Sequence, residues 1–236
     1  MEINYIGHST VELVEGETRI LIDPFLKPNN PAAQLSAEDV DPNHVVITHA
    51  HQDHFADAVA VGKRTGAFFV AISELANVLD EQGIESFADP NLGGTVEFDW
   101  GWVKLVQAFH TSTVPAGDRP FSPTTGTVIG AAAGAVINVG GTTLYHLGDT
   151  ALFSDLRLIA ERTPVDFAFI PIGGHYTMDR HDAVVAADFI GARTVIPIHY
   201  NTFPPIETDA EAFKSDVESQ TKSKVAVLAP GESISV

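Results

Sequence analysis

The chain has 236 residues, no cysteine, and 13 basic against 31 acidic residues, which gives a net charge of -18. The lack of cysteine excludes disulfides and thiolate metal sites, so any metal ligand must be His, Asp or Glu. The scarcity of Lys and Arg argues against nonspecific binding to nucleic acid or to an anionic membrane.

The length fits one large α/β domain, and no linker separates two parts, so a single domain over residues 1–236 is predicted. No apolar run reaches membrane-spanning length, and residues 1–4 lack the basic region of a signal peptide. A cytoplasmic protein is therefore expected. The excess of carboxylates also fits a high-salt cytoplasm, where such groups keep a surface hydrated.

Strands are predicted where apolar and β-branched residues run together, and helices where they recur with helical spacing. In the first part of the chain, strands are predicted over residues 1–6, 11–14, 18–22, 45–48 and 68–72. Helices are predicted over residues 55–64 and 74–82, with Ser73 as a cap for the second and Gly83 at its end.

The later part continues the same alternation of strands and helices. Strands are predicted over residues 94–98, 103–109, 127–129, 135–139, 142–147, 167–170, 194–198 and 224–228, and helices over residues 155–162, 182–190 and 209–220. Residues 111–125 are rich in Thr, Ser, Pro and Gly and form a predicted long loop, of the kind a compact domain keeps for binding. The alternation favours an α/β fold.

Potential metal ligands follow four of the predicted strands. His49, His110 and His199 each come directly after an apolar run, and Asp149 follows another. Ligands in open α/β sheets bind beyond the carboxyl ends of strands, so these four side chains are expected to converge. His146 lies three residues before Asp149 on its strand, which sends it to the opposite face and away from the metals.

The densest cluster is His49-Ala50-His51-Gln52-Asp53-His54. His49 and His51 are two residues apart, so both rings project to the same side of an extended backbone. A polar turn with solvated histidines is the plain alternative, but three histidines and one aspartate within six residues favour a metal site. Paired metals are a recurrent hydrolytic device, because they activate a bridging water and hold the scissile group.

The segment from Thr48 to His54 resembles the T-H-x-H-x-D-H signature of the metallo-β-lactamase superfamily. The later landmarks follow in the same order: His110 after a strand, Gly148-Asp149-Thr150, and His199 after a strand. The resemblance covers nearly the whole chain. It implies a four-layer αββα sandwich with a two-metal site at one edge of its sheets.

The resemblance also implies a complete ligand set. His49, His51 and His110 would hold the first metal, Asp53, His54 and His199 the second, and Asp149 would bridge the two. Asp53 and Asp149 are the candidate catalytic residues, because either can accept a proton during turnover. The metals are expected to be two divalent transition metal ions, with Zn favoured and Mn, Ni or Fe compatible with the same ligands.

Finer features resemble a narrower branch, the uncharacterised metal-dependent hydrolases related to the ascorbate-phosphate lactonase group. These features are Gly7-His8-Ser9, the segments 21–25 and 145–150, Gly173-Gly174 with residues 176–178, and the segment 199–204. The chain lacks the cysteine ligand of many true β-lactamases, so resistance to lactams is not expected.

Four further residues are candidates for substrate contact or for support of a metal ligand. His8 follows the first strand, and Asp23 is expected to orient a metal-binding histidine by hydrogen bonding rather than to bind metal itself. His175 lies after two glycines at a helix start, where freed N–H groups can bind an anion, although capping by Asp179 is the plain alternative. Asn201 flanks His199.

The predicted function is hydrolysis of a small ester, lactone or phosphodiester by metal-activated water. The alternatives are a sensor that binds metal and ligand without turnover, and a di-iron redox enzyme. The expected partner is a small-molecule substrate, with no membrane and no nucleic acid, although a focused acidic site with bound metals can process one. A homo-oligomer is left open.

Overall fold

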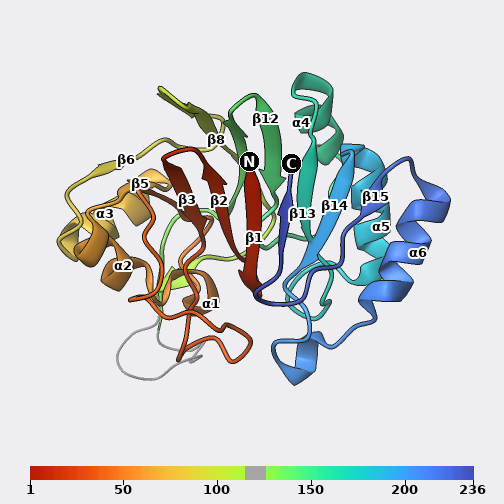
Figure 1. The fold of residues 1–236 in the computed structure, drawn as a ribbon, viewed down its shortest axis with the longest axis horizontal. Coiled ribbons are helices and arrows are strands. Elements are labelled where there is room, and N and C mark those ends of the chain that lie inside the picture. The colour runs from red at the N-terminus through yellow and green to blue at the C-terminus, as the bar shows by residue number, and fades with distance from the viewer. Residues whose placement is uncertain (115–125) are drawn as a thin grey trace.

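The apolar runs of the sequence pair into two seven-stranded mixed sheets in the computed structural model, which describes residues 1–114 and 126–236 (Figure 1). The first sheet has the order β16 (Ser233–Ser235), β1 (Glu2–Gly7), β2 (Thr10–Glu15), β3 (Thr18–Ile22), β4 (His44–Val46), β5 (Phe68–Val70) and β6 (Phe87–Ala88). The second has the order β15 (Lys224–Val225), β14 (Thr194–Ile198), β13 (Phe167–Pro171), β12 (Thr142–His146), β11 (Ala133–Val139), β8 (Gly101–Gln107) and β7 (Thr95–Phe98). A separate short pair joins β9 (Thr113–Val114) to β10 (Thr127–Val128).

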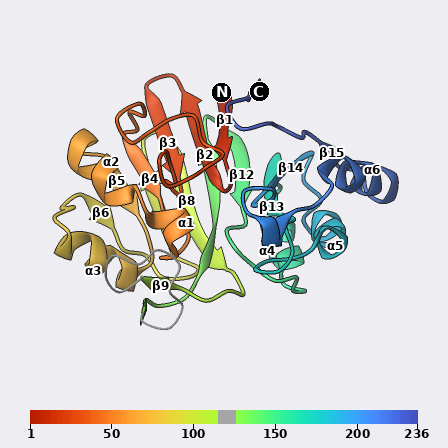
Figure 2. The same ribbon diagram turned by 90° about the horizontal axis from the view of Figure 1, so that it is seen from below.

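Helices form the outer layers, so the molecule is a four-layer αββα sandwich. The first half carries α1 (Gln52–Phe55), α2 (Ala58–Thr65) and α3 (Ser73–Glu81), and the second carries α4 (Leu156–Arg162), α5 (Arg180–Ile190) and α6 (Ala210–Gln220), with a 3-10 turn η1 (Pro204–Ile206). Figure 2, seen from below, places the helices of the two halves on opposite sides of the sheets. None of the helices in the described ranges is long and apolar enough to cross a membrane.

Two hydrophobic cores hold these layers together. The first lies between the sheets, where Ile3 and Leu13 of one sheet share a cluster with Ile137 and Phe169 of the other, and it continues to the helices α2 and α3. The second lies between the outer sheet face and its helices, and includes Phe213 of α6. Burial of this apolar area is the main force that fixes the sheets relative to each other.

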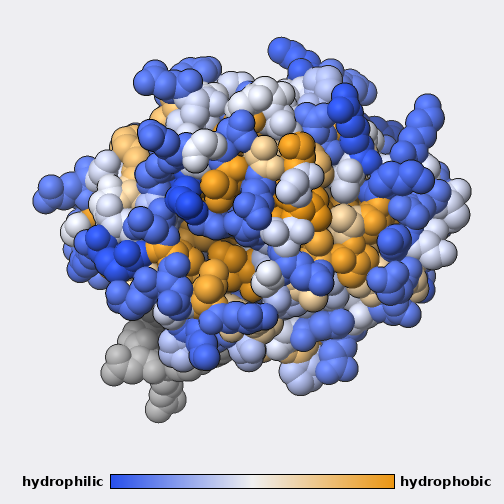
Figure 3. Space-filling model, viewed as in Figure 1, coloured by the Kyte–Doolittle hydropathy of each residue, from blue (hydrophilic) through white to orange (hydrophobic). Residues whose placement is uncertain are grey.

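The two sheets repeat one arrangement. Strand β3 is antiparallel to β2 and parallel to β4, and β12 is antiparallel to β11 and parallel to β13. Asp23 follows β3 and Asp149 follows β12. Asp23 and Asp149 therefore occupy equivalent places in the two sheets. The chain ends also meet, because β1 pairs with β16 in the middle of the face shown in Figure 1, where apolar atoms gather (Figure 3).

The structure differs from the predicted elements in several places. The helix predicted over residues 55–64 is two helices, because the chain breaks at Asp57, whose carboxylate accepts hydrogen bonds from Leu26 N and Asn29 Nδ2. The short strands β6 and β16 were not predicted, and β15 is shorter than expected. Of the predicted loop 111–125, residues 115–125 lie outside the described residues.

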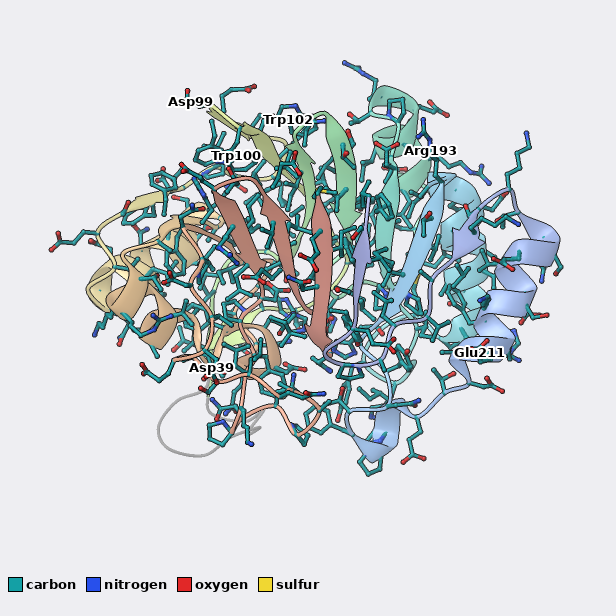
Figure 4. All side chains as sticks on the ribbon, in the orientation of Figure 1. Asp39, Asp99, Trp100, Trp102, Arg193 and Glu211 are labelled. Atoms are coloured by element: carbon teal, nitrogen blue, oxygen red, sulfur yellow. The ribbon has the colours of Figure 1, made fainter. Side chains whose placement is uncertain are left out.

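His44 precedes the strand predicted over residues 45–48, but the structure includes it in the sheet. It begins β4, and its Nε2 accepts a hydrogen bond of 3.1 Å from Trp100 Nε1. Its ring packs edge-on against Phe98 and Trp100, with centroids 5.0 Å away in both cases. Figure 4 shows Trp100, and with it the place of His44, near the upper edge of the molecule. Strands β1 and β14, which His8 and His199 follow, run toward the lower edge (Figure 1).

Candidate metal centre

Three histidines from two segments place ring nitrogens at one point. His49 follows β4 after Ile47 and Thr48, His51 comes two residues later, and His110 comes three residues after the end of β8. His51 Nδ1 lies 3.0 Å from His49 Nε2 and 3.2 Å from His110 Nε2. These three residues form one of the groups whose ligand atoms are close enough to hold an ion.

A second group gathers beside the first. It comprises His8, Asp53, His54 and His199, with all four ligand atoms within 4.8 Å of one another. Asp53 and His54 lie in α1, which turns directly after the first histidines, and His199 follows the last residue of β14. Residues of the first sheet half, near α1, therefore lie next to a residue of the second half, His199.

Asp149 lies between the two groups. Its Oδ2 is 3.4 Å from His110 Nε2 and 3.1 Å from His199 Nε2, and its Oδ1 is 3.3 Å from His54 Nε2. Its Oδ2 is also 3.9 Å from His49 Nε2. One carboxylate thus faces histidines of both groups.

Three of the atoms that face the middle of this cluster make no hydrogen bond. Buried Nε2 of His54, Nε2 of His199 and Oδ1 of Asp149 are all without one. A buried polar atom without a partner is costly, so native proteins rarely leave several together. Imidazole nitrogens and carboxylate oxygens that converge in this way fit divalent transition metal ions, which these ligands bind well.

The carboxylates around His54 and His199 favour positive charge on these two side chains. Burial lowers the pKa of His199, but the carboxylates of Asp149 and Asp53 together outweigh burial and raise that pKa to about 9. Burial also lowers the pKa of His54, but Asp149 and Asp23 together raise it well above its ordinary value. Without metal, protons on these two histidines balance the carboxylates, and a metal cation can take their place.

Histidines of the first group behave in the opposite way. Burial and the neighbouring His110 lower the pKa of His51 to about 4, and burial with repulsion from His54 lowers the pKa of His49 well below its ordinary value. Both rings are therefore neutral near neutral pH, which is the form that binds metal.

Asp23 contacts the side of the ligand histidines that faces away from the centre of the cluster. Its Oδ2 lies 2.7 Å from His54 Nδ1, and the same oxygen accepts a 2.7 Å hydrogen bond from Thr48 Oγ1. Thr48 Oγ1 is in turn 3.0 Å from His49 Nδ1. Asp23 thus orients His54 directly and His49 through Thr48, which leaves the Nε2 atom of each ring toward the centre of the cluster.

Two hydroxyl groups that the sequence analysis did not single out brace the ligand segments. Thr150 Oγ1 accepts a hydrogen bond from Phe109 N, which ties the segment of Asp149 to that of His110. Ser112 Oγ accepts a hydrogen bond from Ala50 N, between the two first histidines. Thr150 stands in the Gly-Asp-Thr motif, so its neighbour Asp149 is the only signal that could have drawn attention to it.

Known proteins that are similar to this chain identify its family. The model of the β-lactamase superfamily domain matches residues 2–199. Two curated relatives, both called UPF0173 metal-dependent hydrolase, come from Shouchella clausii and Thermus thermophilus. The first is 44% identical over 99% of both chains, and the second 45% identical over 98% of this chain and 97% of its own.

The chain belongs to the β-lactamase superfamily. A solved structure, Igni18, a metallo hydrolase from Ignicoccus hospitalis, is 37% identical, covers 99% of this chain and 97% of its own, and superposes with a TM-score of 0.86. The fold is therefore the metallo-β-lactamase fold, and the protein is a metal-dependent hydrolase.

Two of the predicted site residues of this hydrolase lie outside the ligand cluster. His175 is exposed, and its ring packs edge-on against Tyr176 at 4.5 Å. Asn201 is also exposed, and its Oδ1 accepts a hydrogen bond from Thr208 N. His146 is buried behind the cluster, where its Nε2 lies 2.9 Å from Ser9 O and its Nδ1 accepts a hydrogen bond from Gly148 N.

A groove of about 1040 Å³ has among its lining residues His8, which belongs to the second group of this hydrolase centre. Its lining includes Tyr5, Tyr200, Asn201 and Thr202, together with an aliphatic stretch at residues 227–230. None of its described lining residues is Lys or Arg, whereas four are carboxylates. The groove is large enough for a small organic molecule.

Proposed function

We propose that this hydrolase uses two divalent transition metal ions to activate water against a small ester, lactone or phosphodiester. The residues that would hold the first ion are His49, His51 and His110, those for the second are Asp53, His54 and His199, and Asp149 would bind both. The observation that carries the proposal is the set of buried, unpartnered atoms of His54, Asp149 and His199. We favour Zn, and Mn, Ni or Fe suit the same ligands.

The chemistry divides between the ions and the carboxylates. When bound, such ions polarise a carbonyl or phosphoryl oxygen and lower the pKa of water toward neutrality. We propose that Asp53 or Asp149 accepts the proton that the attacking water loses. Despite burial, nearby histidines hold the pKa of each carboxyl well below its ordinary value, led by His199 in both cases, so both carboxylates are ionised.

We further propose that the loops at this edge contact a small-molecule substrate. His175 follows β13, and Asn201 follows β14 two residues after His199. Both have left-handed backbone, with φ of 47° and 57°, and both are exposed where the ligand-bearing strands end. The groove lined by His8 has room for such a small molecule.

The proposal is tested by metal removal and reloading. Protein stripped with a chelator and reloaded with each metal in turn should bind two ions per chain and hydrolyse at least one of a panel of esters, lactones and phosphodiesters. Asp149→Asn should reduce kcat/KM about 1,000-fold, because it removes the carboxylate shared by both ions. Metal content by elemental analysis and initial rates are the measurements.

A matched control removes one carboxylate charge at a position away from the metal centre. Asp99→Asn lies at the upper edge of the molecule (Figure 4), and should retain full activity. Two bound metals with tight ligand binding and no turnover would favour the sensor, and iron with oxygen consumption would favour a redox enzyme. Reloaded protein that binds no transition metal would refute the proposal.

A further inference from the structure

The turn Gly7-His8-Ser9 connects the two halves of the centre through its backbone. His8 O accepts a 2.8 Å hydrogen bond from His199 N and a 3.0 Å hydrogen bond from Tyr5 Oη. Ser9 O lies 2.9 Å from His146 Nε2, on the strand that leads to Asp149. A turn of the first sheet is therefore bonded to two of the three ligand segments of the second, those of Asp149 and His199.

The His8 side chain completes this connection. The residue is only 1% exposed, its Nε2 lies 3.1 Å from Asp53 Oδ2, and its Nδ1 lies 2.9 Å from Thr202 Oγ1. A neutral imidazole has one donor and one acceptor nitrogen. The Thr202 hydroxyl is 3.4 Å from Tyr200 O but only 2.9 Å from Nδ1, so it can donate to Nδ1 instead. This keeps the ring proton on Nε2, where it is donated to the Asp53 carboxylate.

The backbone of His8 shows that this placement is enforced. Its φ of 59° lies in the left-handed region, which residues other than glycine rarely adopt. Its ring is also enclosed by aromatic neighbours, with His199 at 4.0 Å and Phe25 at 5.5 Å between centroids. Strain of this kind persists only where the surrounding structure holds the residue in place.

We infer that His8 is a positioning residue for the second metal ion: it fixes the Asp53 carboxylate, and through Thr202 and its own carbonyl it fixes the segment that carries His199. This inference rests on the two-metal centre proposed above. The hydrogen bond to Asp53 leaves the remaining lone pairs of that carboxylate for a metal. His8 does not belong to the first group of ligands, so the ion of that group should not depend on this residue.

The competing role is direct metal binding by His8, whose Nε2 belongs to the second group. The two roles differ in what a glutamine does at this position. An amide N–H of glutamine can replace the hydrogen bond to Asp53, whereas an amide is a poor ligand for transition metals compared with imidazole. Rescue by glutamine therefore identifies positioning.

The test is a Zn²⁺ titration of stripped protein, read by calorimetry and by competition with a chromophoric chelator. In His8→Asn, which tolerates left-handed backbone, we expect the second ion to bind about 10–100-fold more weakly and the first to be unchanged. His8→Gln should recover most of that loss. Thr202→Val should weaken the second ion by about 5-fold, the value of one hydrogen bond.

Two controls identify the affected site. His51→Ala marks the binding step of the first ion, and His181→Ala removes an exposed histidine and should bind both ions as the unaltered protein does. Circular dichroism and thermal melting check folding, and if His8→Asn does not fold, Thr202→Val and His8→Gln carry the test.

Equal affinities for both ions in His8→Asn, equal weakening of both ions, or a His8→Gln variant as weak as His8→Asn would each overturn the inference. If the unaltered protein itself binds fewer than two ions, the proposed two-metal function fails and this inference fails with it. If the unaltered protein binds two ions and only the His8 variants behave unexpectedly, the proposed function stands and the inference alone is overturned.

Discussion

Five residues other than glycine have left-handed backbone within the described ranges: His8, Asp23, His175, His199 and Asn201. Three of them directly follow a strand, namely β1, β3 and β14. A left-handed residue turns the chain sharply where a strand ends, and His, Asp and Asn tolerate it better than most side chains. Each such residue costs about 1–3 kcal/mol, so their concentration around one centre indicates a functional constraint.

The raised pKa values at the centre predict proton release on metal binding. In stripped protein near pH 7.5, His54 and His199 hold protons, because the pKa of each is raised, that of His199 to about 9. Zn²⁺ binding should therefore release about two protons per chain. Calorimetry in buffers of different ionisation enthalpy measures this number directly.

The sign of the pH dependence follows from the same values. Because metal competes with protons, the apparent affinity should rise with pH through neutrality and flatten as pH passes the His199 pKa of about 9. The first group should add little, since the pKa of His51 is lowered to about 4 and its ring is already neutral. A binding enthalpy that is the same in all buffers would contradict the predicted proton release, and an apparent affinity that does not change with pH would contradict the predicted pH dependence.

At the scale of elements, the sequence predicted the strands that deliver ligands better than the contacts that orient them. The strand over residues 194–198 matches β14, and its apolar run places His199 directly after it. The hydrogen bond from Leu26 N to Asp57, where the helix breaks, and the contact between His8 and Thr202 join residues far apart in sequence. The second pair is 194 positions apart. No local pattern encodes such contacts, because they depend on how the two sheets meet.

Gly173 illustrates a contact between elements that only the structure reveals. It follows β13, and a Cβ placed on it would overlap the carbonyl oxygen of His199 and lie 2.8 Å from Ile206 Cβ. We expect Gly173→Ala to cost about 2 kcal/mol, or roughly 6 °C in Tm, and to weaken the second metal ion by displacing His199. Thermal melting and Zn²⁺ titration are the measurements.

Gly191→Ala is the matched control for this substitution. Gly191 ends α5 with a φ of 59°, and nothing lies within 4 Å of a Cβ placed there. This change should cost about 1 kcal/mol from backbone strain alone, with metal binding unchanged. If Gly173→Ala binds both ions as tightly as Gly191→Ala, the packing of β13 against the His199 segment does not position that ligand.

At the scale of the whole molecule, acidic side chains cover the surface. The labelled Asp39, Asp99 and Glu211 lie on different sides of the fold in Figure 4, and hydrophilic residues surround the apolar middle of the face in Figure 3. Arg64 faces two carboxylates, Glu38 and Asp41, at 3.9 and 3.6 Å. With 31 acidic against 13 basic residues, most carboxylates have no cation to pair with, so the folded chain repels itself.

This repulsion predicts that salt stabilises the protein. Between about 0.05 M and 1 M NaCl the screening length falls from over 10 Å to about 3 Å, which weakens repulsion between surface carboxylates. We expect a gain of roughly 2 kcal/mol, or about 6 °C in Tm for a chain of this size. The melt should be run on stripped and on metal-loaded protein, because bound cations already neutralise the centre but leave the surface charge untouched.

The two forms should therefore gain nearly the same Tm from salt, with the loaded form higher at every concentration. NaCl and KCl should act alike, since screening depends on ionic strength rather than on the identity of the cation. A Tm that does not change with salt would show that the surface carboxylates are spaced widely enough not to interact. A gain confined to the stripped form would instead assign the salt effect to the carboxylates of the metal centre.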